Sequence, residues 1–255
     1  MSIGTLGLRE QKKRETRRAI SDHATQLFLE RGFDRTTIAD IAAAARVAKM
    51  TVTNYFPRKE DLALDQHEAF VAGLAQAVAH RRAGESALAA VRRAFMEALE
   101  RRDPVIGFTG RDLARMVADS PTLVARLRDL HDQREESLAA RLTTESIPPR
   151  THPRETSSNP DAPNSSDPTA QGIPQDRDPT ARSASQDRDS TAQDGEIVAR
   201  AVAAQLAAAD RLLFRDLRSR TLAGQRDDDI AAALAGAARQ VFALLEPAIG
   251  DYAIR

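Results

Sequence analysis

The chain has 255 residues, and the 42% that are hydrophobic suffice for the core of one large or two small domains. Lys and Arg total 37, as do Asp and Glu, so the net charge of zero indicates no class of partner. The absence of cysteine excludes disulfides, zinc fingers and thiol catalysis. The N-terminus has no apolar signal-peptide core, and no apolar run is long enough to span a membrane, so we expect a cytoplasmic protein without membrane contact.

The charge is unevenly distributed, because residues 1–60 hold 12 Lys and Arg against 7 Asp and Glu, an excess of five. A basic cluster leads into a predicted amphipathic helix that ends at Gly32: Arg9, Lys12, Lys13, Arg14, Arg17 and Arg18. The apolar face of this helix is Ile20, Ala24, Leu27 and Phe28. The cluster is either a solvated helix start or a contact with DNA, for which we take Arg14 and Arg17 as candidate phosphate ligands.

A pair of short helices is predicted over residues 37–56. Thr37 and Asp40 have the spacing of a capping pair, which starts a helix with an apolar stripe at Ile38, Ile41, Ala42 and Ala45. After a break at Arg46 and Val47, a second helix carries Val52 and Phe56 on its inner side. The polar side chains left over suit a helix that lies in the major groove of DNA, and they are Lys49, Met50, Thr51, Thr53 and Asn54.

The same stretch resembles the signature of the TetR/AcrR family of one-component transcriptional regulators. The matching residues are Thr37-Ile38, Ile41-Ala42, Val47, Thr51, Tyr55-Phe56-Pro57 and Lys59-Glu60-Asp61-Leu62. The resemblance implies that residues 9–60 form a helix-turn-helix domain with Lys49 to Tyr55 as the recognition helix. It further implies that Thr37, Tyr55 and Lys59 hold DNA phosphates.

The sequence departs from the family pattern at three positions. Arg46 stands where the family often has Gly in the turn, and Ala48 and Arg58 stand where it often has a capping Ser. Loss of a capping hydroxyl costs about 1 kcal/mol per helix end. Arg46 and Arg58 are either additional phosphate contacts or solvent-exposed arginines.

Residues 61–145 are predicted to form an all-helical body without strands. We expect one helix from Glu60 to about Arg82, another over residues 86–101, and two more that start at Asp103-Pro104 and Ser120-Pro121. Apolar side chains on these helices are candidates for a ligand pocket, although they fit an ordinary core equally well. The candidates are Phe70, Leu74, Phe95, Met96, Leu99, Phe108, Leu113 and Met116, with His67 and His131 as weaker ones.

The composition changes between residues 146 and 194, which are rich in Pro, Ser, Asp and Thr. Asp-Pro-Thr-Ala or a close variant recurs at Asp167, Asp178 and Asp189, a period of 11 residues. Prolines and the lack of an apolar stripe argue against a helical supercoil of this period. We therefore expect a disordered insertion that grew by duplication.

Two Ala-rich helices are predicted in residues 195–255. One stripe runs through Ile197, Ala201, Leu206, Ala209, Leu213 and Leu217, and the other through Ile230, Leu234, Ala237, Val241, Leu244, Leu245 and Ile249. Helices this apolar favour a two-fold interface of four helices, although both stripes could instead be internal core. The family resemblance also places dimerisation on the last two helices.

These patterns favour a homodimeric repressor that a small molecule releases from a palindromic DNA operator. The makeup of the pocket candidates suggests an apolar or amphipathic effector. No catalytic, metal-binding or cofactor-binding motif is present, so we expect neither an enzyme nor a bound cofactor. The alternative is an effector-independent regulator or an activator whose body docks a protein partner.

Overall fold

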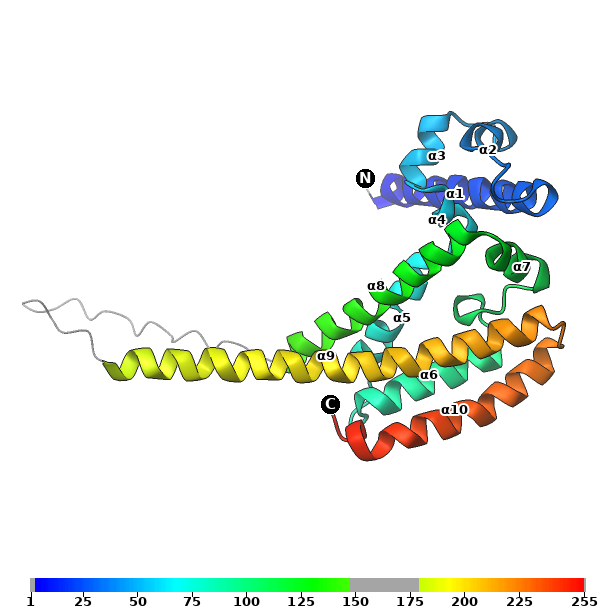
Figure 1. Ribbon diagram of the computed structural model, residues 1–255. Coiled ribbons are helices and arrows are strands. Elements are labelled where there is room, and N and C mark those ends of the chain that lie inside the picture. The colour runs from blue at the N-terminus through cyan, green and yellow to red at the C-terminus, as the bar shows by residue number, and fades with distance from the viewer. Residues whose placement is uncertain (1–2, 147–178, 255) are drawn as a thin grey trace, which may run out of the picture.

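Helices make up all the regular structure in residues 3–146 and 179–254, which are the parts of the chain that the computed structural model describes (Figure 1). The prediction of an all-α fold is confirmed. The elements are α1 (Ile3–Arg31), α2 (Ile38–Ala44), α3 (Lys49–Tyr55), α4 (Lys59–Ala63), α5 (His67–Ala79), α6 (Ala87–Arg101), the 3-10 turn η1 (Pro104–Ile106), α7 (Arg111–Asp119), α8 (Pro121–Ser146), α9 (Pro179–Leu222) and α10 (Asp227–Ile249).

The first four helices share one hydrophobic cluster. Its fully buried members include Ile20 and Phe28 of α1, Ile41 of α2 and Val52 of α3. Helix α1 ends as predicted, because Gly32 adopts a left-handed conformation (φ +85°) and its N–H donates to the Phe28 carbonyl at 2.9 Å. The amphipathic pattern therefore makes α1 the platform on which the short helices pack.

The prediction of a single helix from Glu60 to Arg82 is wrong, because the chain leaves the helical conformation between α4 and α5. Leu64 has φ −116° and ψ 51°, and the Asp65 carboxylate accepts a hydrogen bond from the Ser21 hydroxyl of α1 at 2.5 Å. A tertiary contact to a residue far away in the sequence thus fixes this linker, and helical periodicity does not reveal it.

The predicted start signals of the body helices give two different outcomes. Ser86 and Ser120 cap α6 and α8, since their hydroxyls accept from the N–H groups of Ala89 (3.2 Å) and Leu123 (3.4 Å). Asp103 caps only the short turn η1, and α7 begins later, at Arg111. The helix cannot run on from Pro104 because Gly107 and Gly110 both have positive φ.

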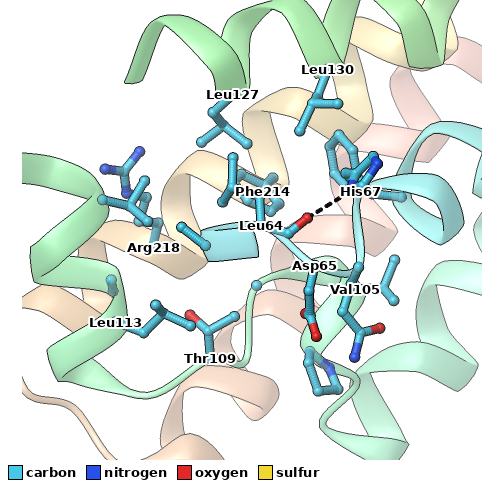
Figure 2. Close-up of a pocket in the computed structure, with 17 residues that line it drawn as sticks. Leu64, Asp65, His67, Val105, Thr109, Leu113, Leu127, Leu130, Phe214 and Arg218 are labelled. Carbon is cyan, nitrogen blue, oxygen red and sulfur yellow. Dashed lines mark hydrogen bonds between the residues drawn. The ribbon is translucent and has the colours of Figure 1, made fainter. Parts of the chain in front are cut away.

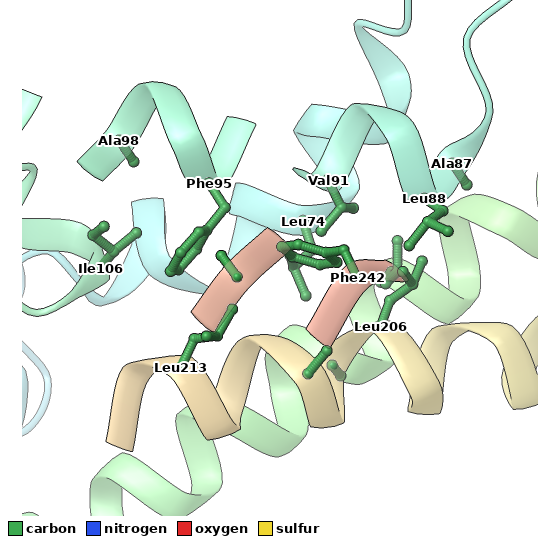
Figure 3. Packing of buried hydrophobic residues seen from close by; sticks show 14 of the residues in the cluster. Leu74, Ala87, Leu88, Val91, Phe95, Ala98, Ile106, Leu206, Leu213 and Phe242 are labelled. Atoms are coloured by element: carbon green, nitrogen blue, oxygen red, sulfur yellow. The ribbon is translucent and has the colours of Figure 1, made fainter. Parts of the chain in front are cut away.

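The body is a layered bundle in which α8 packs along α5 and α9, while α10 packs against α6 and α9. Figure 3 shows its core, where side chains from α6, α9 and α10 meet. The rings of Phe95 and Phe242 pack edge to face with their centres 6.1 Å apart, and Leu206 and Leu213 lie beneath them in this view. Close helix contact is possible because alanines such as Ala199 and Ala203 are fully buried.

Helix α9 begins at Pro179, well before the expected start at Glu196. Its first part therefore overlaps the predicted insertion, while residues 147–178 lie outside the described part of the chain. The apolar stripe begins only near Ile197, but extension of a helix beyond its packed part is cheap once the helix is nucleated. In Figure 1 this end of α9 projects beyond the other helices of the body.

Helix α10 is the one described helix with the length and apolarity to cross a membrane. One face of the helix packs on the body, where Ile230, Leu234, Ala238 and Phe242 are fully buried against neighbouring helices. Its opposite side is exposed, and Leu244 retains 80% of its accessible surface.

Candidate DNA interface and ligand cavity

The turn between α2 and α3 is built by local hydrogen bonds. Thr37 and Asp40 form the predicted capping box, with Asp40 N–H to Thr37 Oγ1 at 3.2 Å and Thr37 N–H to Asp40 Oδ2 at 2.9 Å. Hydrogen bonds from the Thr37 side chain and backbone lower the pKa of Asp40 below its ordinary value. The Thr37 hydroxyl also donates to Asp40 Oδ2 at 2.6 Å, so its proton is already engaged in the cap.

The end of α2 is a Schellman motif, since the N–H of Val47 donates to the Ala42 carbonyl and that of Arg46 to the Ala43 carbonyl. Arg46 occupies the left-handed position of this motif with φ +54°. A left-handed conformation is unfavourable for any residue with a Cβ, which explains why glycine is common at such a place. The Arg46 side chain is exposed.

Helix α3 presents two contrasting sides. Val52 is fully buried, as is Phe56 directly after the helix, whereas Lys49, Met50, Thr53 and Asn54 are exposed and Thr51 and Tyr55 are partly exposed. No side chain caps the helix at Ala48. The Thr53 hydroxyl donates back to the Met50 carbonyl at 3.1 Å, which leaves Asn54 and Thr51 as the more available polar groups.

Two of the basic residues expected at DNA phosphates are engaged inside the protein. Lys59 Nζ donates to the carbonyls of Phe33 (3.1 Å) and Thr36 (3.2 Å) and lies 4.2 Å from the centre of the Phe33 ring. Arg17 stacks 4.5 Å above the Phe56 ring and donates to the Asp65 carbonyl at 3.5 Å. Both cations therefore stabilise the domain, and that role could not be deduced from the motif.

A different set of cations lies beside α3, close to Tyr55. Arg9, Lys12, Lys13 and Thr16 of α1 line a hollow together with Tyr55 and with one acid, Glu10, and we call this hollow the basic groove. These residues share one helical face, with spacings of three and four, whereas Arg14 lies on another face with Arg18. The helical register, once α1 is known to run without a break through this cluster, is the signal that selects them.

The DNA-binding domain is joined to the body by buried polar contacts. The Arg126 guanidinium of α8 lies 2.8 Å from the Asp61 carboxylate of α4, and both side chains are almost fully buried. The linker after α4 is held to α1 by the Ser21–Asp65 hydrogen bond. Val117 and Leu123 of the body complete the apolar cluster of the domain.

A cavity of about 110 Å³ lies directly beneath this linker (Figure 2). Its walls come from the end of α4, the α4–α5 linker, the start of α5, η1 and the loop after it, α7, α8 and α9. The apolar side chains are Ala63, Leu64, Phe70, Pro104, Val105, Leu113, Ala114, Val117, Leu127, Leu130 and Phe214. The polar side chains are Asp65, Gln66, His67, Thr109 and Arg218.

The structure does not bring all the pocket candidates together. Phe70 and Leu113 line the cavity, with His67, whose Nδ1 lies 3.0 Å from the Leu64 carbonyl. Leu74 and Phe95 line a second hollow, between α5 and α6. The remaining candidates pack among other apolar residues: Met96, Leu99 and Phe108 in the cluster of the body and Met116 in that of the DNA-binding domain. Four lining residues were not among the candidates, because only the crossing of the helices places them at the cavity: Leu127, Leu130, Phe214 and Arg218.

A buried polar cluster adjoins the cavity on the side of α5. Arg134 of α8 pairs with Asp210 of α9 at 2.9 Å and also donates to the Phe70 carbonyl. His131 packs edge to face against Phe70 and Phe214, with ring centres 5.0 and 5.1 Å away. Burial lowers the pKa of His131 from 6.5 to about 4, so the imidazole is neutral at pH 7.

An exposed second helix of a helix-turn-helix, joined to an all-helical body, defines the class of DNA-binding transcriptional regulators. Residues 20–65 match the family described as bacterial regulatory proteins, tetR family, so this part of the chain carries the DNA-binding domain of that family.

Similarity to individual proteins extends beyond that domain. The HTH-type transcriptional regulator TcmR of Streptomyces glaucescens is 35% identical over 138 residues, which is 52% of this chain and 61% of that protein. A TetR-family regulator from Syntrophomonas wolfei covers 91% of the chain and 96% of its own, at 15% identity and a TM-score of 0.47. A TetR regulator from Rhodococcus sp. RHA1 covers 91% and 97%, at 16% identity and a TM-score of 0.41.

Proposed function

We propose that the protein is a cytoplasmic homodimeric repressor that binds a near-palindromic operator and is released by a small molecule. The observation that carries the proposal is the exposed polar face of α3 beside the basic groove. Cations next to a helix that projects polar side chains supply phosphate contacts and base contacts from one surface.

The contacts divide between two groups of residues. Lys49, Thr51 and Asn54 contact base edges in the major groove, together with Met50 and Thr53. Tyr55, Arg46, Arg14 and the cations of the basic groove contact phosphates. Arg17, Lys59 and the Thr37 hydroxyl act mainly by holding the domain in shape, because their donors are engaged within the protein.

The dimer forms through the outer faces of α9 and α10. Both helices carry small and apolar side chains that are exposed: Ala201, Ala208 and Leu212 on α9, and Ala232, Ala243, Leu244 and Ala248 on α10. Leu212 and Leu244 keep 55% and 80% of their surface in the monomer, which an apolar interface would bury. Two recognition helices in such a dimer meet half-sites about 34 to 36 Å apart.

The cavity links a ligand to DNA release. Leu64, Asp65 and Gln66 form one of its walls, and Asp65 is tied to α1 of the DNA-binding domain. A ligand that displaces this wall would favour a state with a different spacing of the recognition helices, and DNA affinity would fall by its differential binding to the two states. This apolar cavity favours an effector over the alternative of a body that only docks another protein.

Selection of bound DNA from a random pool, followed by binding titrations at several salt concentrations, tests the proposal. We expect Lys13→Ala to weaken binding to all sequences and to reduce the salt slope by about one. Asn54→Ala should instead change the preferred base at one position of each half-site, a discrimination of about 1–3 kcal/mol. Arg128→Ala, an exposed position of the body, is the control and should change neither.

The dimer is tested by sedimentation of the Leu244→Arg variant. We expect a dimer for the wild type and a monomer for this variant, because a charge in an apolar interface is costly. Leu29→Arg alters an exposed leucine of α1 and should leave the dimer intact. A wild-type monomer that selects no sequence from the pool would refute the proposed function.

A further inference from the structure

One arginine at the cavity has no acidic partner among the residues that the structure describes. Arg218 of α9 lines the cavity and is partly buried, and it makes no hydrogen bond or ion pair with any of the described residues. Its Nε is inaccessible to solvent and without an acceptor. Burial lowers the pKa of the Arg218 guanidinium below its ordinary value, which is the expected result of removing water from a charge without supplying a partner.

Two other arginines of the body each have a carboxylate partner, unlike Arg218. Arg126 pairs with Asp61, and Arg134 with Asp210, both at nearly complete burial. The cavity itself offers one carboxylate, Asp65, but that group already accepts from the Ser21 hydroxyl. Figure 2 shows Arg218 beside apolar side chains of α7 and α8, on a different wall from Asp65.

A charge that is partly removed from water and has no partner among the described residues is unfavourable for the folded protein, so its position favours a partner from outside the chain. From this geometry we infer that the cavity binds an organic acid, whose apolar body fills the space between Leu113, Leu127 and Phe214 and whose anionic oxygens accept from Arg218. The planar guanidinium can offer two parallel N–H donors to a carboxylate. This inference rests on the proposed ligand-responsive function and gives its effector a chemical class.

The size of the cavity restricts the class further. At about 110 Å³ the space is of the order that holds a single aromatic ring. An acid with a larger body would press on the walls of this half-open cavity, of which the α4–α5 linker is the one tied to the DNA-binding domain. Small acids should therefore bind without releasing DNA, and larger acids of the same charge should release it.

Calorimetric titration of the full chain with matched acids and amides tests the inference. The probes are benzoate with benzamide and 1-naphthoate with 1-naphthamide, which differ in charge but hardly in shape. We expect each acid to bind about tenfold to a hundredfold more tightly than its amide, the ratio that a charge-assisted hydrogen bond gives. Arg218→Met should abolish this preference, whereas Arg215→Met, which alters an exposed arginine one turn earlier on α9, should preserve it.

Two further measurements separate a binding role from a structural one. Thermal unfolding of Arg218→Met without ligand should occur at or above the wild-type midpoint, because the variant removes an uncompensated charge. Leu113→Trp, which fills the cavity and leaves Arg218 in place, should weaken the binding of both acids.

The inference is overturned if acids and amides bind alike, if none of the four probes binds at millimolar concentration, or if Arg218→Met keeps the preference or unfolds earlier than the wild type. DNA binding is assayed separately, so an acid preference in a chain that binds no operator would contradict only the proposed function.

Discussion

Replacement of Arg46 by glycine should stabilise the protein and weaken its binding to DNA at the same time. Arg46 is held at φ +54° by the Schellman motif that ends α2. The left-handed conformation costs a residue with a Cβ about 1–2 kcal/mol, and glycine loses about 0.5–1 kcal/mol through its freer unfolded chain. The net gain for Arg46→Gly is therefore about 0.5–1 kcal/mol, or about 1–4 °C in the unfolding midpoint.

Arg46→Ala separates the backbone effect from the charge. Alanine keeps the Cβ and its strain but removes the guanidinium. We therefore expect the free energy of unfolding of Arg46→Ala to lie within about 0.5 kcal/mol of the wild-type value. Both variants should lose one phosphate contact, which reduces the salt slope of operator binding by about one. Thermal unfolding and salt-dependent titration measure the two effects. Equal midpoints for the glycine and alanine variants would refute the strain argument, and unchanged salt slopes in both would refute the phosphate contact.

Three further changes test the stability of the domain and the body. Ala48→Ser should stabilise the protein by about 1 kcal/mol in thermal unfolding, because Ala48 caps α3 without a side-chain acceptor. His131 is neutral in the folded state down to about pH 4, whereas the unfolded chain takes up a proton below pH 6.5. Its contribution to stability is thus fully present above pH 6.5 and is lost as the pH falls toward 4, at about 1.4 kcal/mol per pH unit; urea unfolding of His131→Gln should lack this slope. Arg134→Met should destabilise the body by about 3–5 kcal/mol, because it leaves Asp210 buried and unpaired. The double variant Arg134→Met/Asp210→Leu should recover most of that loss.

For each of these changes, one result would contradict the reasoning. A lower midpoint for Ala48→Ser would mean that the start of α3 cannot accommodate a cap. The same pH slope in His131→Gln and the wild type would assign it to other groups. A double variant as unstable as Arg134→Met would show that packing around the guanidinium, such as its contact with the Phe70 ring, matters more than the charge.

The sequence by itself determined the elements whose cause is local. The capping box at Thr37, the start of α3 after Ala48 and the all-helical class follow from side chains a few residues apart, since caps and amphipathic stripes act within one or two turns. The sequence did not predict where α7 and α9 begin. Two glycines separate α7 from its expected start at Asp103-Pro104, and α9 extends past its own apolar stripe.

Only the tertiary structure decided which functional groups are free to act. Lys59 and Arg17 carry the charge that a phosphate contact needs, but carbonyls and aromatic rings from other helices hold them. Arg218 lies in an ordinary amphipathic repeat, and only the crossing of α7, α8 and α9 places it at a cavity where none of the described residues pairs with it. Residue identity fixes the chemistry that a side chain can perform, whereas its neighbours, which come from distant parts of the chain, decide whether that chemistry is already used.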